Sequence, residues 1–453
     1  MANKIETSGD EDFLSVPVPE NERMGRFGLT MAWWALCSAM FWLMVPATLA
    51  LTLGAKNVLI GLVLSTVVYA IINGAITRFS IKTGLSVEQF SELLFGKVGA
   101  QLATLIFCAT AIYYAVFEGS VIAVAINAYF PSIDLKYAFL IVICYSVPLV
   151  FGSVQHWLDK FNGVLLPFYL IGLVAAVAMT VSEYGYSDAW LQLGPGSDVP
   201  EDGWWQCFTY FMGVWIMMMY TWDYARLGRK EDADYHARYN FGWLFYVFTF
   251  LVNAMVGIFI AGTIPLEGGI SEVSAVLGLL KLMGLFGLAF VWVSQTRINT
   301  ANFYLSAINM QAFLKSAFNV HLPKVLCVIA VGFIVYNLML QNVFSFILKA
   351  LAYQGTLVVA WVSIALVFIY LKRTADMSPA TLGAQLSRTP TVRWGALSAW
   401  ILSSVLGALL LQAPQGIAGW SAPVTALTAA GIYFVVKSRY IRNDRVSAYQ
   451  LGD

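Results

Sequence analysis

The chain has 453 residues, of which 59% are hydrophobic and only 11% are charged, and its net charge is +1. This composition excludes a water-soluble domain and a nucleic-acid-binding protein, and it predicts an all-α integral membrane protein surrounded by a lipid bilayer. The three histidines are far apart and the five cysteines lie in apolar runs without metal-like spacing, so the sequence predicts neither a bound metal nor a cofactor.

The chain starts with a polar, acidic segment, residues 1–27, which lacks the apolar core and cleavage site of a signal peptide. We expect it to be a retained and partly disordered tail. About twelve apolar runs follow, each long enough or nearly long enough to cross a hydrocarbon layer of about 30 Å. The predicted transmembrane helices are 28–54, 58–78, 98–129, 137–153, 162–183, 205–225, 239–263, 274–312, 324–341, 343–371, 394–412 and 418–437.

The segments outside these helices are shorter and more polar. Residues 79–97 have amphipathic spacing, which predicts a short helix at the membrane surface. Residues 184–204 form an acidic loop that we expect outside the membrane, whereas 372–393 form a basic loop that we expect in the cytoplasm. Residues 438–453 are expected to be a cytoplasmic C-terminal tail.

The positive charges are distributed unevenly between the two sides of the predicted helices. Lys56 and Lys136 fall in external loops, while Lys281, Arg297 and Lys349 fall within helices. All other Lys and Arg residues lie on the side of the N-terminus. Because cytoplasmic loops of membrane proteins carry an excess of Lys and Arg, we expect a multi-pass protein of the cell inner (plasma) membrane with both termini in the cytoplasm.

Two of the predicted helices contain residues that can interrupt them. The first contains Ser38 and is interrupted by Pro46, and the sixth contains Gly213. A helix interrupted at mid-depth exposes backbone groups, and such groups often bind solutes and ions at the midplane of secondary transporters. Proline and glycine are also common in membrane helices without any such role, so neither interruption is specific by itself.

Four ionisable residues lie within the predicted helices, where a charge is costly and usually faces a cavity or a partner: Glu118, Asp223, Arg297 and Lys349. Tyr114 lies one helical turn before Glu118, so an aromatic ring and a carboxylate share one face, as suits a planar nitrogenous substrate. Alternatively, Glu118 is a buried carboxylate neutralised by Arg297 or Lys349. Glu118, Asp223 and Lys349 are also candidates for proton coupling or gating.

The eighth predicted helix carries a polar stripe. Gln295, Asn299, Asn302 and Ser306 follow helical spacing, while Arg297 lies about 200° from Asn299 around the helix axis. The stripe is explained either by hydrogen bonds to a substrate or by hydrogen bonds to a neighbouring helix. We expect Gln295, Asn299 and Asn302 to face a substrate cavity.

Four motifs occur in a consistent order: VPVPENER before the first helix, KTGL after the second, TWDYARLGRK at the end of the sixth and SQTRINTANFYLSAIN in the eighth. Together they resemble the nucleobase:cation symport family, which includes purine-cytosine permeases and hydantoin and cytosine transporters. The resemblance implies a LeuT-type fold with two inverted five-helix repeats, 28–183 and 205–371, and two further helices in 394–437. It also implies a substrate held between the first, third, sixth and eighth helices.

The resemblance also assigns positions to substrate binding. It matches Tyr114 to an aromatic residue that stacks on the base, and it places Glu118 at or beside a polar position that is often Gln. In the sixth helix the matching aromatic position is Val214 or Trp215, of which we favour Trp215. Ser38 and Asn299 match substrate-binding positions of the first and eighth helices.

The chain departs from the family beside Asn299. Sodium-coupled members have two adjacent hydroxyl residues there, and they complete a sodium site with carbonyl groups of the first helix. This chain has Arg297 and Ile298 instead. A hard cation requires oxygen ligands, which Ile298 lacks, and it would be repelled by a guanidinium group. We therefore expect no sodium site, with Arg297 in the place of the ion.

The sequence thus predicts a secondary transporter that works by alternating access without sodium, either coupled to protons or acting as a uniporter or exchanger. The expected substrate is a small nitrogenous solute, nucleobase-like or cationic with a guanidinium-type group. An alternative is a facilitator for a neutral N-heterocycle such as cytosine, a purine, allantoin or a vitamin. Another is a sensor that does not transport. No nucleophile–base pair occurs at catalytic spacing, so an enzyme is not expected.

Overall fold

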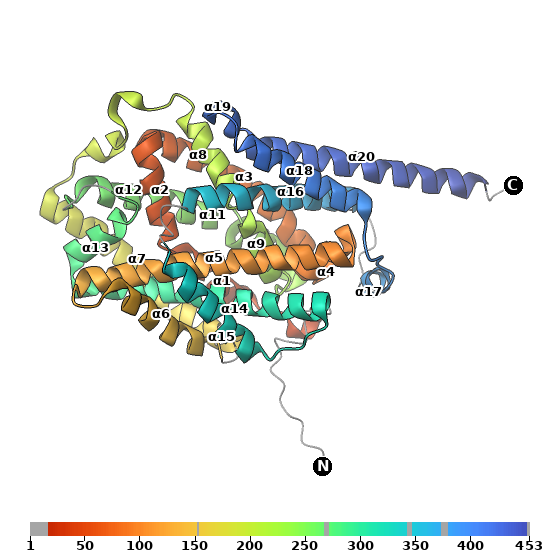
Figure 1. Ribbon diagram of the computed structural model, residues 1–453, viewed down its shortest axis with the longest axis horizontal. Coiled ribbons are helices and arrows are strands. Elements are labelled where there is room, and N and C mark those ends of the chain that lie inside the picture. The colour runs from red at the N-terminus through yellow and green to blue at the C-terminus, as the bar shows by residue number, and fades with distance from the viewer. Residues whose placement is uncertain (1–16, 152–153, 267–270, 342–346, 373–378, 451–453) are drawn as a thin grey trace, which may run out of the picture.

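The computed structural model describes residues 17–151, 154–266, 271–341, 347–372 and 379–450. These residues are mainly helical and contain no β-strand, and seven of the helices are long and apolar enough to cross a membrane. Most long helices run along one direction, which is the long axis of the molecule in Figure 1. The protein is therefore an all-α integral membrane protein, as the composition predicts.

The first five predicted crossings form the N-terminal half of the fold, and the first of them is broken. A short amphipathic helix, α4, joins the second crossing to the third and begins with a capping box at Ser86. The elements are α1 (Arg26–Trp34), η2 (Ala35–Ser38), α2 (Phe41–Leu53), α3 (Ala55–Thr83), α4 (Val87–Phe95), α5 (Lys97–Tyr129), α6 (Leu135–Leu149) and α7 (Val154–Tyr184).

The sixth to tenth crossings also begin with a broken helix, and the seventh contains two π-helical segments. The elements of these five crossings and their connections are α8 (Gly203–Met212), α9 (Ile216–Ala225), α10 (Ala233–Tyr235), η6 (His236–Asn240), α11 (Trp243–Tyr246), η7 (Val247–Val252), α12 (Asn253–Thr263), α13 (Ser274–Met283), α14 (Leu285–Phe318), α15 (Lys324–Met339) and α16 (Ile347–Lys372). The chain ends with α17 (Pro379–Ser387), α18 (Trp394–Leu410), α19 (Gln415–Ala418) and α20 (Ser421–Gln450).

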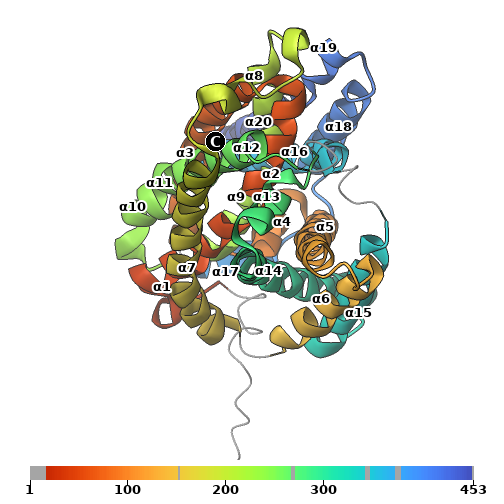
Figure 2. The same ribbon diagram turned by 90° about the vertical axis from the view of Figure 1, so that its left-hand side faces the viewer.

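The helices pack so that the broken first helix lies against the eighth. The irregular segment η2 contacts α14, and α14 in turn packs along α5 over much of its length. In contrast, α16, α18 and α20 pack together at one side of the molecule (Figure 2), outside this group. The centre of the fold is therefore formed by α2, α5, α9 and α14.

The break in the first helix is not at Pro46, the one candidate breaker in this stretch. Pro46 lies inside α2, where it removes one backbone donor without ending the helix. The chain instead becomes extended at Ala39, whose ψ angle is 129°. In the sixth crossing, by contrast, α8 ends at Met212 and α9 begins at Ile216, so the break falls at Gly213 as the sequence indicates.

The predicted eighth helix, 274–312, is two helices. They are separated by Gly284, whose φ angle of +56° is in the region that favours glycine. A Cβ at Gly287 would lie 2.4 Å from the carbonyl oxygen of Leu279, so the two helices meet closely at this corner. Lys281 consequently belongs to the short helix α13, where it donates to the carbonyl of Pro265, and not to the long crossing α14.

Both predicted tails contain more structure than expected. Residues 1–16 lie outside the described residues, but the segment that follows is bound to the rest of the fold. Arg23 donates to the carbonyls of Ile81 and Gly228, and Arg26 pairs with Asp232 at 2.7 Å. At the other end, α20 continues to Gln450 through most of the predicted tail; the last three residues lie outside the described residues. The predicted loop 372–393 contains α17.

One glycine lets the seventh and first crossings approach closely, and it provides a test of the packing. A Cβ at Gly257 would lie 2.2 Å from the carbonyl oxygen of Leu43, whereas a Cβ at Gly431 in α20 would meet nothing within 4 Å. We expect Gly257→Ala to lower the stability by about 1–3 kcal/mol because α2 and α12 must separate. Gly431→Ala is the control and should leave the thermal unfolding midpoint unchanged or slightly raised. Equal midpoints for both variants would contradict the close contact.

Candidate functional site

A cavity lies where the two broken helices meet α5 and α14. It is lined by Leu36, Ala39, Phe41, Trp42, Tyr114, Glu118, Val214, Met217, Tyr220, Tyr224, Ile298, Ala301 and Asn302. Its volume is about 30 Å³, which is enough for a water molecule but far below the about 300 Å³ or more that ligand sites usually have. A heterocycle can therefore enter only when these elements move apart.

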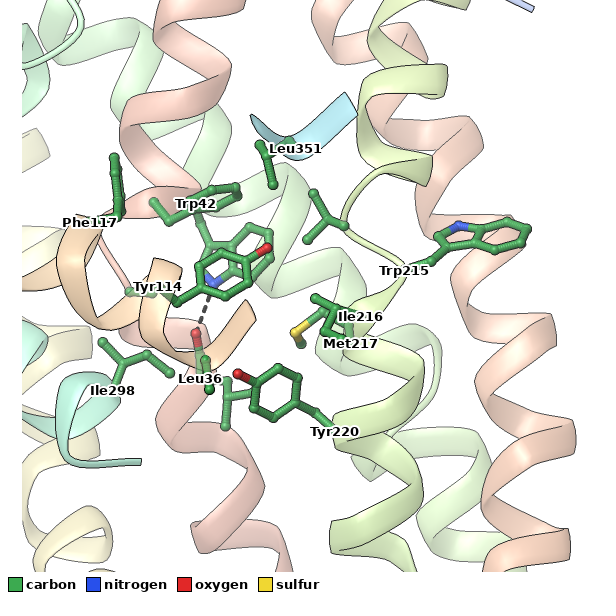
Figure 3. Close-up of a cluster of buried hydrophobic side chains, with 14 of the residues drawn as sticks. Leu36, Trp42, Tyr114, Phe117, Trp215, Ile216, Met217, Tyr220, Ile298 and Leu351 are labelled. Carbon is green, nitrogen blue, oxygen red and sulfur yellow. Dashed lines mark hydrogen bonds between the residues drawn. The ribbon is translucent and has the colours of Figure 1, made fainter. Parts of the chain in front are cut away.

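The backbone groups freed by the break in the first helix are bonded to side chains. The indole Nε1 of Trp42 donates to the carbonyl of Leu36 at 2.7 Å (Figure 3), and Asn253 Nδ2 donates to the carbonyl of Cys37 at 2.8 Å. The backbone N–H of Met40 donates to Gln295 Oε1 at 2.8 Å. These bonds replace those of a continuous helix, which explains how an interrupted segment is stable inside the membrane.

Gln295 joins this break to the carboxylate of Glu118. Its Nε2 atom donates to Glu118 Oε2 and to the backbone carbonyl of Glu118, while its Oε1 atom accepts from Met40. Glu118 is 1% exposed, and among the described residues no ion pair joins it to Arg297. The neutral amide of Gln295 is therefore the side-chain partner of Glu118, and not the cation that the sequence offered as an alternative.

Aromatic side chains form much of the cavity wall. The rings of Phe41 and Tyr114 meet edge to face with centroids 5.7 Å apart, and Tyr220 lines the opposite side from α9. The hydroxyl groups of Tyr114 and Tyr220 and the Nδ2 atom of Asn302 are buried and have no hydrogen-bond partner in the described part of the chain. Buried polar groups are nearly always bonded, so these three are the groups that a polar ligand would satisfy.

Arg297 lies on the other face of α14, away from this cavity. Its side chain is fully buried and lies near Cys37 of η2 and Tyr169 of α7. The Tyr169 hydroxyl donates to Asn253 Oδ1 at 2.8 Å, and Asn253 in turn holds the carbonyl of Cys37. Arg297 therefore lies beside a polar network that connects the first, fifth and seventh crossings.

The structure brings together only some of the residues predicted to bind substrate. Tyr114, Glu118 and Asn302 line the cavity, and Gln295 is bonded to Glu118 behind its wall. Asn299 is fully buried beside Gly119, and neither of its amide atoms has a partner among the described residues.

Two further predicted residues are not in the cavity. Ser38 donates to the carbonyls of Ala35, at 2.8 Å, and Ser294, at 3.4 Å, so its hydroxyl contributes to helix packing. The side chain of Trp215 points away from the other rings, as Figure 3 shows, and Val214 lines the cavity in its place. The residues between α8 and α9 do not continue the helical register, which explains why the sequence did not predict this orientation.

Asp223 and Lys349, the other candidates for coupling or gating, also lie elsewhere. Asp223 Oδ1 accepts from the backbone N–H of Val87 at 2.9 Å and lies 3.7 Å from Arg226, so it anchors the start of α4. Lys349 is exposed near the start of α16 and lines a different cavity, beside Gly213. The structure thus gives neither residue a contact with the central cavity.

The cavity also contains aromatic and methionine side chains that were not predicted from the sequence, among them Phe41, Trp42, Met217, Tyr220 and Tyr224. All of these except Tyr224 lie within about two helical turns of one of the two breaks, which is the signal the sequence carries for them. The sequence is rich in aromatic residues throughout, so the spacing alone does not distinguish these from core residues.

Comparison with known proteins gives structural relatives only: no family model and no curated protein matches the chain. Mhp1, a nucleobase-cation-symport-1 family transporter in a closed conformation with bromovinylhydantoin bound, matches with a TM-score of 0.73 at 16% identity, over 95% of this chain and 96% of the other. Inward-facing Mhp1 has the same TM-score and identity, over 95% and 93% of the two chains. The protein has a LeuT-type transporter fold. This confirms the fold that the sequence motifs imply.

Other transporters share the LeuT-type fold at lower similarity. A Na⁺-coupled sialic acid symporter matches with a TM-score of 0.59 at 11% identity, over 95% of this chain and 92% of the other. A manganese transporter of Eremococcus coleocola matches with a TM-score of 0.53 at 13% identity, over 95% and 98%. These similar structures are membrane transporters with different substrates, so the substrate of this chain must be argued from the site itself.

Proposed function

We propose that the protein is a sodium-independent secondary transporter of a small, planar nitrogenous solute, nucleobase-like or cationic. The observation that carries this proposal is the buried carboxylate of Glu118 in the wall of an aromatic cavity between the two broken helices. A carboxylate there accepts N–H groups or balances a positive charge, and the ring of Tyr114 offers a flat apolar surface. The cytoplasmic location of both termini is part of the proposal and is supported by the distribution of Lys and Arg.

The polar groups around the cavity support a solute with polar atoms on more than one edge. Glu118 is an acceptor, the amide N–H₂ of Asn302 is a donor, and the two tyrosine hydroxyls can act as either. A guanidinium compound or an amino-substituted heterocycle fits this combination. A neutral heterocycle such as cytosine or a purine would use the same groups, with Glu118 accepting its N–H groups, and it is the second candidate class.

The surroundings of Arg297 support transport without sodium. Ile298 has no oxygen to offer a cation, and the carbonyls of Leu36 and Cys37 already accept hydrogen bonds from Trp42 and Asn253. The guanidinium group adds a fixed positive charge near Cys37. A sodium ion would have to displace those bonds and approach a like charge, both of which are unfavourable.

Glu118 is also the best candidate for proton coupling. It is buried, and its side chain is bonded to the neutral amide of Gln295 and not to a cation. A bound proton or a cationic substrate would each neutralise it, and exchange between the two would couple their movements in opposite directions.

The proposal is tested by uptake of labelled guanidinium compounds, nucleobases and vitamins into liposomes that contain the purified protein. A prior screen for solutes that raise the thermal unfolding midpoint would select the compounds. We expect the selected solute to accumulate equally in sodium and in potassium medium, and a pH gradient to change the rate if Glu118 carries protons. Strict dependence on sodium would overturn the assignment of Arg297, and binding without uptake would favour a sensor.

A further inference from the structure

A second cavity, of about 290 Å³, lies at the end of the molecule where α4 meets α16, α18 and α20. Figure 1 shows α4, α17 and the start of α18 at this same end. One part of its lining is polar and consists of Arg393, Tyr433 and Lys437. Another part is apolar and includes Leu93, Phe368 and Val436. The cavity is therefore amphipathic and, unlike the central one, large enough for a ligand without rearrangement of the helices.

The polar part of this cavity has a net positive charge. Among the residues that the structure describes, no acidic side chain lines it and none pairs with Arg393. The Nε atom of Arg393 is buried and has no hydrogen-bond partner among the described residues, and Tyr433 lies close enough to interact with Arg393 electrostatically. A buried guanidinium N–H without an acceptor requires one, and an anion with several oxygens supplies it.

We propose that this cavity binds the phosphate headgroup of an anionic phospholipid in the cytoplasmic leaflet. Arg393 and Lys437 bind the phosphate, and the apolar side, with Phe368 and Val436, lies against an acyl chain. Trp394, which is 74% exposed, begins α18 beside the cavity, as suits an aromatic residue at the membrane surface. The choice of leaflet rests on the proposed orientation of the chain in the membrane. The charge and the shape of the cavity are independent of that orientation.

The cavity is joined directly to the start of α5, the helix that carries Glu118. The backbone N–H of Arg393 donates to the carbonyl of Phe95 at 2.9 Å, and that of Val98 donates to the carbonyl of Thr391 at 3.0 Å. Between them, Gly96 has a φ angle of +84°, and a Cβ there would lie 2.8 Å from the carbonyl of Pro390. A lipid bound to Arg393 therefore stabilises the corner between α4 and α5, and its occupancy affects the position of the third crossing.

The test measures lipid binding by the full chain in neutral detergent, without any transported solute. Phosphatidylglycerol, phosphatidylcholine and free glycerol phosphate are titrated while the thermal unfolding midpoint is followed. We expect only phosphatidylglycerol to raise the midpoint, and Arg393→Gln combined with Lys437→Gln to weaken its apparent affinity about 30-fold, at about fivefold for each cation near an anionic lipid. Arg388→Gln combined with Lys82→Gln removes two exposed charges outside the cavity and is the matched control.

Three results would overturn the proposal: an unchanged response in the cavity variant, an equal loss in the control pair, or a full response to free glycerol phosphate, which would indicate a small-anion site. If the double variant does not fold, Lys437→Gln alone should weaken the apparent affinity about fivefold, while Lys437→Arg, which keeps the charge, should leave it unchanged. Because no solute is transported in this experiment, its outcome is independent of whether the proposed substrate class is correct.

Discussion

Glu118→Gln is expected to weaken binding of a cationic substrate about 10- to 100-fold, because it replaces a buried carboxylate acceptor by a neutral amide. The change keeps the shape of the side chain, so the aromatic walls formed by Phe41 and Tyr114 should remain in place. The measurement is the uptake of labelled solute into liposomes over a range of concentrations, together with the shift in thermal unfolding midpoint that each solute produces.

The same variant separates the two substrate classes. A neutral heterocycle should keep most of its affinity for Glu118→Gln, since the amide oxygen still accepts an N–H group, and its uptake should lose any dependence on a pH gradient. Glu183→Gln is a suitable control, because it makes the same change at an exposed carboxylate near the end of α7 that does not line the cavity. Unchanged kinetics and pH dependence in Glu118→Gln would return this carboxylate to a structural role.

The fold could be predicted further than the site because most crossings are signalled by local composition. The break at Gly213 and the shared face of Tyr114 and Glu118 follow from residues close together in sequence. The break at Ala39 does not. It is stabilised by Trp42 from the next turn and by Gln295 from a helix far along the chain, so it depends on packing that a single helix does not encode.

The same limit explains the two clearest errors. Trp215 was favoured over Val214, but at 3.6 residues per turn one position changes the direction of a side chain by about 100°, and the register is lost between α8 and α9. Gly284 lies in an otherwise apolar helical pattern, where glycine is also common within helices. The positive φ angle of Gly284 and the close contact of Gly287 with the backbone of Leu279, which only the folded structure reveals, distinguish a corner from a continuous helix.

The two polar constellations in the centre of the fold lie on different faces of α14. Gln295 connects the break in the first crossing to Glu118 on one face, while Arg297 lies beside the Cys37–Asn253–Tyr169 network on the other. Under the proposed function, substrate binding at Glu118 and the fixed charge of Arg297 would both act on the same irregular segment, η2 and the residues after it. This arrangement supports a mechanism in which the position of the first crossing depends on whether Glu118 is neutralised.

Arg297→Met is expected to lower transport strongly and to destabilise the protein, because a buried cation near Cys37 is replaced by a shorter, neutral side chain. Truncating a large buried side chain costs about 2–5 kcal/mol, and Arg297→Ala should show this loss in thermal unfolding. Met fills part of the space and should recover part of the stability, but not transport, if the charge itself is required. Arg297→Lys retains the charge and should recover part of the transport, although it lacks the planar set of donors.

The order of these variants decides between a packing role and an electrostatic one. If Arg297 stands in for a cation, the uptake rate should be highest in the unmodified protein, lower in Arg297→Lys and lowest in Arg297→Met. Both variants should still bind solute in the thermal-shift measurement, since Arg297 does not line the cavity. If Met transports as well as Lys, the charge is dispensable and only the volume matters. Addition of sodium should not restore uptake by any variant, because the side chain of Ile298 still supplies no oxygen ligand and Asn253 still donates a hydrogen bond to the carbonyl of Cys37.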